Sequence, residues 1–176
     1  MGFFTMNQFD LNKYLNSQEL TDEKINEFIE KEIIKIEDSN KEEIEGHLLK
    51  SEHNLKFVKD NIKLNYFDWA ITGCYYASYH SALALILTKG YSSKNHLATL
   101  LIIIKEFYNR GLDKEDIQTL VHLLDYQDIL FYVESKNKRE DATYSTQTDY
   151  TKQEVEQLRI KATFFVSKIK TMMGEK

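Results

Sequence analysis

The chain of 176 residues contains no proline, only six glycines and one cysteine. Proline at its average usage of about 5% would supply roughly nine residues. A many-stranded β-sandwich needs a tight turn every dozen residues or so, and a sequence this poor in turn-forming residues does not suit that class. The single cysteine, Cys74, excludes a disulfide framework within the chain. These absences favour long helices joined by short polar loops.

Long apolar runs are also missing. The longest apolar stretch, from Ala77 to Thr88, is interrupted by His80 and falls short of the roughly 20 residues that a membrane-spanning helix needs. No basic start followed by an apolar segment indicates a secretory signal. We therefore expect a cytoplasmic protein without a membrane segment. The net charge of −5 gives no general argument for nucleic-acid binding.

Charge is distributed unevenly along the chain. Residues 1–45 carry 12 acids and 5 bases, whereas residues 46–176 carry 16 acids and 18 bases. The main body is therefore mildly basic, and an acidic segment precedes it. Two interpretations are open: the acids form the solvated outer face of an extra helix, or the segment covers a positive site.

Apolar residues at steps of three and four predict helices along most of the chain. One helix is expected to begin at Thr21 and to continue through Ile36, with a capping box beginning at Ser39. Further helices are expected over 40–63, 68–88, 94–109 (capped by Ser93), 113–136 and from Thr151 to the C-terminal end. We predict an all-α fold, in which an N-terminal extension (1–38) with one amphipathic helix precedes an up-and-down bundle of four to five helices (39–176).

The expected helix over 68–88 carries a row of small residues and a group of large rings. The small residues recur at three- and four-residue steps, so that a neighbouring helix can approach closely; they are Ala70, Gly73, Cys74, Ala77, Ser81 and Ala84. Helical spacing also places Tyr75 beside Tyr79, and Tyr76 beside His80. These rings serve either core and interface packing, or the wall of a polar pocket or a dimer contact.

Metal and cofactor motifs are not evident. The five histidines include no His-x3-His pair, and no repeated Glu-x-x-His occurs. We therefore expect no metal site and no cofactor, and the histidines are interpreted as surface or interface groups. A Gly-rich phosphate loop is also absent.

A basic cluster lies between the last two expected helices. Lys136, Lys138 and Arg139 precede two acids and Tyr144. One interpretation is a solvated helix end whose bases complement the helix dipole. The other is a phosphate site, since arginine stays charged and forks onto phosphate oxygens. His96, in the first turn of its expected helix, is the histidine that we predict to complete such a site.

Two of these segments resemble one family. Residues 68–96 follow the pattern DWAIxxxYYAxxHxAxALLxxKGYxxKxH, and Arg139-Glu-Asp-Ala-Thr-Tyr144 is similar to R-x-x-A-D-Y. Both patterns are typical of the stand-alone archaeal and bacterial branch of the HEPN family (higher eukaryotes and prokaryotes nucleotide-binding). With the flanking helices, the resemblance covers about residues 40–173. Thr143 stands where the branch usually has aspartate.

The resemblance implies a helical bundle that forms a homodimer. Many relatives pair with a minimal nucleotidyltransferase in toxin–antitoxin modules. Some HEPN proteins are metal-independent ribonucleases with an R-x4-6-H motif, in which the arginine holds the phosphate and the histidine moves protons. No arginine of this chain has a histidine at that spacing.

We therefore expect a non-catalytic or weakly catalytic module that binds a nucleotide, an RNA or a nucleotidyltransferase partner. The alternatives are a ribonuclease toxin with a dispersed site, for which Arg139 and His96 are the catalytic candidates, and a purely structural helical interaction protein. The predicted ligand-binding residues are Arg139, Asp141, Tyr144, His96, Lys94, Tyr76 and His80.

Overall fold

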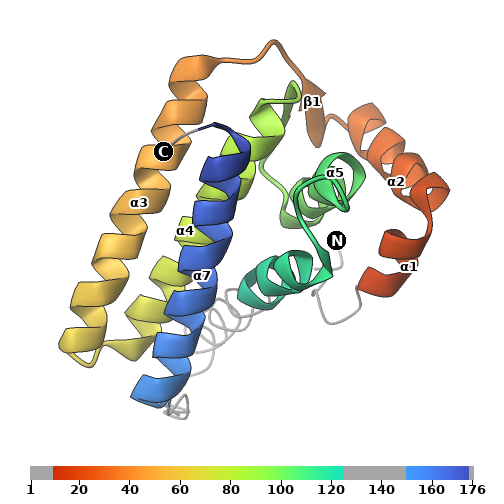
Figure 1. Cartoon of the computed structure of the whole chain (residues 1–176). Helices are drawn as coiled ribbons and strands as arrows, with labels where there is room; N and C mark the ends of the chain where they lie inside the picture. The colour runs from red at the N-terminus through yellow and green to blue at the C-terminus, as the bar shows by residue number, and fades with distance from the viewer. Residues whose placement is uncertain (1–9, 125–149, 175–176) are drawn as a thin grey trace, which may run out of the picture.

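Three long helices form one layer of the molecule. The computed structural model describes residues 10–124 and 150–174. Within them, α3 (Lys41–Lys63), α4 (Phe67–Leu87) and α7 (Lys152–Met172) lie side by side (Figure 1). α3 and α4 form an antiparallel hairpin, and α7 packs against both. The predicted all-α fold is confirmed.

α4 is the central helix, and its small residues contact α3. Ala77 is fully buried, and its carbonyl accepts a hydrogen bond of 2.7 Å from the Ser51 hydroxyl of α3. A Cβ atom at Gly73 would lie 2.6 Å from Cγ2 of Val58. Only a residue without a side chain allows the two helices to approach this closely. Gly73 and Ala77, two members of the row of small residues, thus lie directly against α3.

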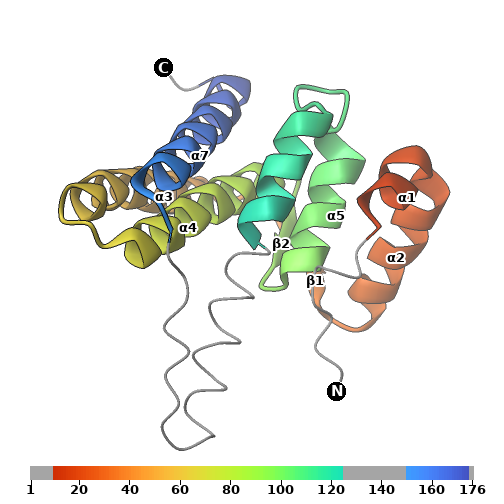
Figure 2. The same cartoon turned by 90° about the horizontal axis from the view of Figure 1, so that it is seen from below.

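A second group of helices covers the other side of α4. It comprises α1 (Leu11–Asn16), α2 (Gln18–Glu30), α5 (His96–Phe107) and a helical segment over 114–124. Figure 2 shows α5 between α4 and the N-terminal pair α1 and α2, and crossing the long helices at a steep angle. Ile25 and Phe28 of α2 belong to the same buried cluster as Leu101 and Ile103 of α5. The N-terminal extension therefore shares its core with the bundle.

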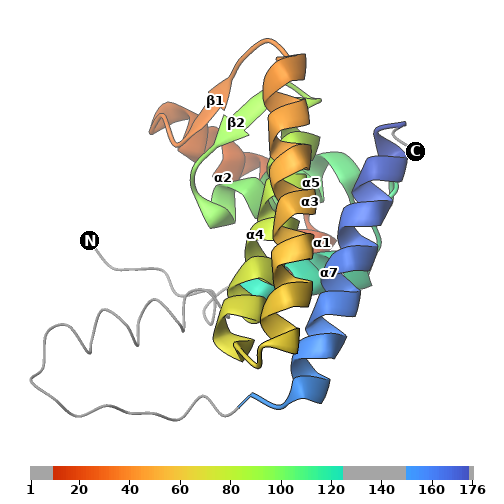
Figure 3. The same ribbon diagram turned by 90° about the vertical axis from the view of Figure 1, so that its left-hand side faces the viewer.

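A short β-ribbon ties the extension to the turn before α5. Strand β1 (Ile34–Ile36) pairs antiparallel with β2 (Tyr91–Ser93), with Ile34 opposite Ser93 (Figure 3). The prediction that the first helix continues through Ile36 is therefore wrong. Ile34 is buried whereas Lys35 and Ile36 are exposed, so the burial pattern alone does not identify a strand. Pairing with β2, more than 50 residues away along the chain, decides the conformation.

Three helix starts also differ from the prediction, because a side chain nearer the true first turn acts as the cap. α2 begins after Ser17 rather than at Thr21, since the Ser17 hydroxyl accepts from the Leu20 amide at 3.3 Å. The Asn40 side chain caps α3 by accepting from the Glu42 and Glu43 amides, so Ser39 is not the cap.

Asn95 caps α5 in the same way, because its side chain accepts from the Ala98 amide at 2.9 Å. Ser93, the predicted cap, instead ends β2. The capping box of Thr151 and Glu154 at the start of α7 is confirmed. No helix in the described ranges combines the length and the apolar character that crossing a membrane requires.

The acids of the extension lie mainly on its outer surface. Glu23 and Glu30 of α2 are exposed, whereas Ile25 and Phe28 face the core. Asp22 differs from them, since its carboxylate forms an ion pair of 2.8 Å with Lys105 of α5. The interpretation as a solvated outer face thus holds for most of α2.

Candidate functional site

The structure describes four of the seven predicted ligand-binding side chains, namely Tyr76, His80, Lys94 and His96. The other three, Arg139, Asp141 and Tyr144, lie outside the described residues, as does the predicted end of the helix near residue 136. The site is therefore built from α3, α4 and the segment that enters α5.

His96 lies against two tyrosines of α4. It is the first residue of α5, and Asn95 caps this helix just before it. Its Nε2 atom is 2.7 Å from the Tyr75 hydroxyl, so one of the two groups donates a hydrogen bond to the other according to the histidine tautomer. The Tyr79 ring meets the His96 ring edge-on, with centroids 4.8 Å apart. These contacts fix the orientation of the His96 ring.

A second pair of rings lies one residue further along α4, on the neighbouring face of the helix. Tyr76 and His80 stack with centroids 6.3 Å apart, as their spacing predicts. The Nδ1 atom of His80 is 2.8 Å from the Nδ1 atom of His47 on α3. Both histidines are partly exposed, and Tyr76 is 40% exposed. This pair therefore faces solvent where α3 and α4 meet.

Tyr75 connects the rings around His96 with the pair of Tyr76 and His80, because its ring centroid is 4.7 Å from that of Tyr76. Six rings from three helices thus form one continuous group, which we name the ring cluster; its members are His47, Tyr75, Tyr76, Tyr79, His80 and His96. Three of the predicted site residues belong to it. The interpretation of these rings as core packing applies to Tyr75 and Tyr79, which are buried, and not to Tyr76.

The surroundings of the histidine pair favour neutral rings. Burial lowers the pKa of His80 from 6.5 to about 4, with further contributions from His47 and Lys50. Burial also lowers the pKa of His47, and Lys50 acts in the same direction while Glu43 opposes it. Both imidazoles are therefore uncharged at neutral pH. Burial raises the pKa of Tyr79, which keeps that hydroxyl protonated.

The depressed pKa of His80 predicts that acid destabilises the fold. Between pH 6.5 and about 4 the unfolded chain binds a proton that the folded chain excludes, so stability falls as the pH falls through this window. We expect His80 to account for roughly 1–2 kcal/mol of this loss, a figure reduced because the ring is partly open to solvent. Urea denaturation at several pH values should show a shallower pH dependence for His80→Gln. Equal slopes for this variant and the unmodified chain would contradict the prediction, and His53→Gln is the matched control at an exposed histidine of α3.

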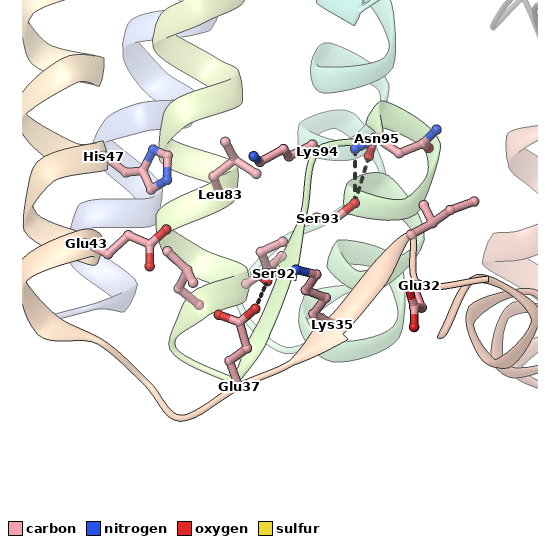
Figure 4. Close-up of a pocket in the computed structure, with 13 residues that line it drawn as sticks. Glu32, Lys35, Glu37, Glu43, His47, Leu83, Ser92, Ser93, Lys94 and Asn95 are labelled. Atoms are coloured by element: carbon pink, nitrogen blue, oxygen red, sulfur yellow. Dashed lines mark hydrogen bonds between the residues drawn. The ribbon is translucent and has the colours of Figure 1, made fainter. Parts of the chain in front are cut away.

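A pocket of about 680 Å³ opens beside the ring cluster. It lies between the β-ribbon, α3 and α4, and Figure 4 shows His47 and Lys94 on its walls with Leu83 between them. Glu37, whose carboxylate accepts a hydrogen bond of 3.0 Å from the Ser92 hydroxyl, lines the lower part. Glu32 also lines it. Two acids of the extension thus line the same pocket as Lys94, and the interpretation that the segment covers a positive site stays a prediction.

Two functional features were missed from the sequence. His47 pairs with His80 across two helices although 33 residues separate them, so no local spacing could reveal the contact. The pocket needs the β-ribbon, whose strand β1 was predicted to be the end of a helix. In residues 10–124 and 150–174, no group of three or more histidine, cysteine, aspartate or glutamate side chains is arranged to hold a metal ion.

Comparisons with known proteins identify the family. Two proteins of Methanocaldococcus jannaschii are similar to this chain. The one named "Putative toxin MJ0605" is 30% identical over 135 residues, which cover 77% of this chain and 92% of the relative. The one named "Putative toxin MJ0142" is 29% identical over 137 residues, which cover 77% of this chain and 85% of the relative.

A third relative, a "UPF0332 protein" of Archaeoglobus fulgidus, is 24% identical over 76% of this chain and 98% of its own length. The model of the HEPN domain matches residues 44–172, a range that holds most of α3, all of α4, α5 and α7, and all six rings of the ring cluster. By this match the chain belongs to the HEPN domain family.

Proposed function

We propose that this chain is a toxin-type HEPN module that binds RNA or a nucleotide on the outward face of α4. The observation that carries the proposal is the exposed Tyr76 ring, which stacks on His80 and is available to stack on a base. Aromatic rings that face solvent beside positive charge are the usual means of binding single-stranded nucleic acid. The names of the two Methanocaldococcus relatives support the toxin-type reading.

Positive charge is present beside His80 and on the wall of the adjoining pocket. Lys50 on α3 is exposed and close enough to lower the pKa of both His47 and His80. Lys94 is exposed on the opposite wall of the pocket. Lysines near an aromatic platform supply phosphate contacts that tolerate any base sequence. The arrangement favours recognition of backbone and base planes over recognition of one sequence.

Trp69 extends the same face of α4 toward the start of the helix. It lies two turns before Tyr76, is 58% exposed and is the chain's only tryptophan. Its fluorescence therefore reports on this face alone. A base that stacks near Trp69 is expected to quench the emission, which gives a direct binding signal for the unlabelled protein.

Tyr76→Ala is expected to weaken the binding of short single-stranded RNA by about 5- to 150-fold, because loss of one base–aromatic stack costs about 1–3 kcal/mol. Titration of Trp69 fluorescence with oligonucleotides of increasing length measures the affinity. Phe164→Ala is the matched control, since Phe164 is a 72% exposed aromatic residue of α7 rather than of α4. Equal affinities for Tyr76→Ala and the unmodified chain would reject the proposed surface.

The same samples distinguish binding from catalysis. Incubation of the oligonucleotides in the presence of a chelator tests for a metal-independent ribonuclease. Cleavage that is lost in both His96→Gln and Arg139→Ala would support the ribonuclease alternative, because these are its two candidate residues. Binding without cleavage would support the module as proposed. A minimal nucleotidyltransferase partner and a homodimer stay predictions from the family resemblance.

A further inference from the structure

The pocket beside the ring cluster combines an apolar side with a polar rim. Leu83, Ile86 and Leu87 of α4 supply the apolar side. Five charged side chains also line the pocket, and they are Glu32, Glu37 and Glu43 together with Lys35 and Lys94. The volume of about 680 Å³ lies within the roughly 300–1,000 Å³ of small-molecule sites. The pocket is therefore large enough for a nucleobase with its sugar.

The charges of this lining decide which ligand fits. Three carboxylates and two ammonium groups leave one net negative charge, which disfavours a phosphate group inside the pocket. The two lysines in turn disfavour a cation. A neutral planar group with both hydrogen-bond donors and acceptors suits both kinds of side chain, because carboxylates only accept and ammonium groups only donate. The nucleobases have this character.

We propose that the pocket binds a guanine base, and this inference rests on the proposed binding of RNA or a nucleotide. Glu43 accepts from N1–H and from the 2-amino group of the base, while Lys94 donates to O6 or N7. Figure 4 shows Glu43 and Lys94 on opposite walls of the pocket, with Leu83 between them. The base then lies against the apolar side chains of α4. Lys50, which is exposed on α3 outside this lining, stays available for phosphate.

The pocket adjoins the aromatic platform through His47. His47 lines the pocket, and its Nδ1 atom is 2.8 Å from that of His80. His80 in turn stacks on Tyr76, with ring centroids 6.3 Å apart. Two ring contacts therefore lead from the pocket to the exposed Tyr76 ring. A strand with one base on Tyr76 can place a neighbouring base, turned out of the stack, in the pocket, and single-stranded RNA is commonly recognised in this way.

Two carboxylates are placed to accept from the base. Glu43 lies in the first turn of α3, close enough to His47 to influence the pKa of that ring. Glu37, directly after β1, is held by the Ser92 hydroxyl, which donates to its carboxylate at 3.0 Å. That bond leaves further lone pairs on the Glu37 carboxylate. Glu43 is the main acceptor, because it lies on the wall next to the platform, and Glu37 adds a second.

Guanine is the base that this lining favours. Its N1–H and 2-amino group are adjacent donors, so that one carboxylate can accept from both. Uracil has no amino group and presents two carbonyl oxygens, which the carboxylates repel. Adenine and cytosine each offer a single amino group. We therefore expect guanine to bind most tightly, adenine and cytosine less tightly, and uracil most weakly.

Titration of the full-length chain with an oligouridylate, and with the same oligomer carrying one central guanosine or inosine, tests the proposal. Trp69 fluorescence reports the binding. Guanosine should raise the affinity at least about fivefold, the lower limit for a bidentate base contact. Inosine, which lacks the 2-amino group, should lose most of this gain. Glu43→Gln should abolish the gain, because the single oxygen of an amide does not replace both oxygens of the carboxylate.

Glu45→Gln is the matched control, since Glu45 is an exposed acid of the same helix that lines a different pocket. This variant should keep the full preference for guanosine. If guanosine gives no gain in the unmodified chain, or if the gain survives in Glu43→Gln, the pocket does not bind guanine, while the proposed RNA-binding surface stands.

Calorimetry with guanosine monophosphate and uridine monophosphate separates the pocket from the RNA-binding surface. Guanosine monophosphate binding that depends on Glu43, in a chain that binds none of the oligomers, would reject the RNA-binding surface and support the pocket. Failure of every oligomer and of both mononucleotides to bind would reject both proposals. Spermidine binding that is tighter than guanosine monophosphate binding, and that is lost in Glu43→Gln, would assign the pocket to a cation and overturn the inference.

Discussion

Removal of residues 1–38 is expected to lower the free energy of unfolding by at least about 3 kcal/mol. Ile25, Phe28 and Ile34 are 0%, 7% and 1% exposed, and all three lie in the core that includes α5. Burial of each such side chain contributes roughly 1.5–3 kcal/mol, part of which is offset by the entropy of ordering the extension. The deletion also leaves β2 without its partner strand. Chemical denaturation of the two chains measures the difference.

Point variants of the intact chain separate the apolar contacts from the acidic charge. Phe28→Ala should cost roughly 3–5 kcal/mol by itself, because it leaves a cavity against α5. Glu23→Gln and Glu30→Gln change exposed acids of the same helix and should alter stability by no more than about 0.5 kcal/mol. If the shortened chain is as stable as the complete one, the extension is a passive tail and the packing argument fails.

Gly73→Leu is the second substitution with a large expected effect, a loss of about 2–3 kcal/mol. The first added atom, Cβ, would lie 2.6 Å from Cγ2 of Val58 and 3.1 Å from Cδ1 of Phe57. Val58 is fully buried, so it cannot move aside into solvent. The higher helix propensity of leucine offsets only about 1 kcal/mol of this loss in stability. Thermal and urea unfolding give the net value.

The control for Gly73→Leu is Thr72→Leu, one residue earlier on α4. Thr72 is partly exposed and is not a member of the buried clusters, so the added methyl groups extend into solvent. We expect a change within about 0.5 kcal/mol. If Gly73→Leu is as stable as Thr72→Leu, α3 can move away from α4 without loss of stability, and the prediction is wrong. Because α3 carries His47, such a movement would also separate the histidine pair.

The sequence alone predicts the helices whose apolar residues repeat over several turns. The expected helix over 68–88 corresponds to α4 (Phe67–Leu87), and the one over 40–63 corresponds to α3. Within α4 the stacking of Tyr76 on His80 follows from helical geometry alone. Local periodicity thus predicts both the element and the neighbours that lie on one of its faces.

The parts that the sequence did not reveal depend on contacts between distant segments. Ile33 and Ile36 fit the three-residue step of a helix, while Ile34 and Ile36 fit the two-residue step of a strand. A segment this short therefore does not distinguish a helix from a strand by its apolar pattern. The contact between His47 and His80 arises from the register between α3 and α4. That register is set by buried groups such as Ser51 and Gly73, whose partners a single sequence does not identify.

The central position of α4 also determines how the site can change with time. Most of this helix is buried by α3, α5 and α7, so its amide hydrogens can exchange with solvent only when the whole domain opens. Slow exchange in α4 means that the backbone beneath Tyr76 and His80 stays fixed on the timescale of ligand binding. Only the surface side chains could then adjust to a ligand, by rotations that take picoseconds to nanoseconds. The ring cluster is therefore expected to be a rigid platform, and the proposed RNA or nucleotide would meet a shape that exists before it binds.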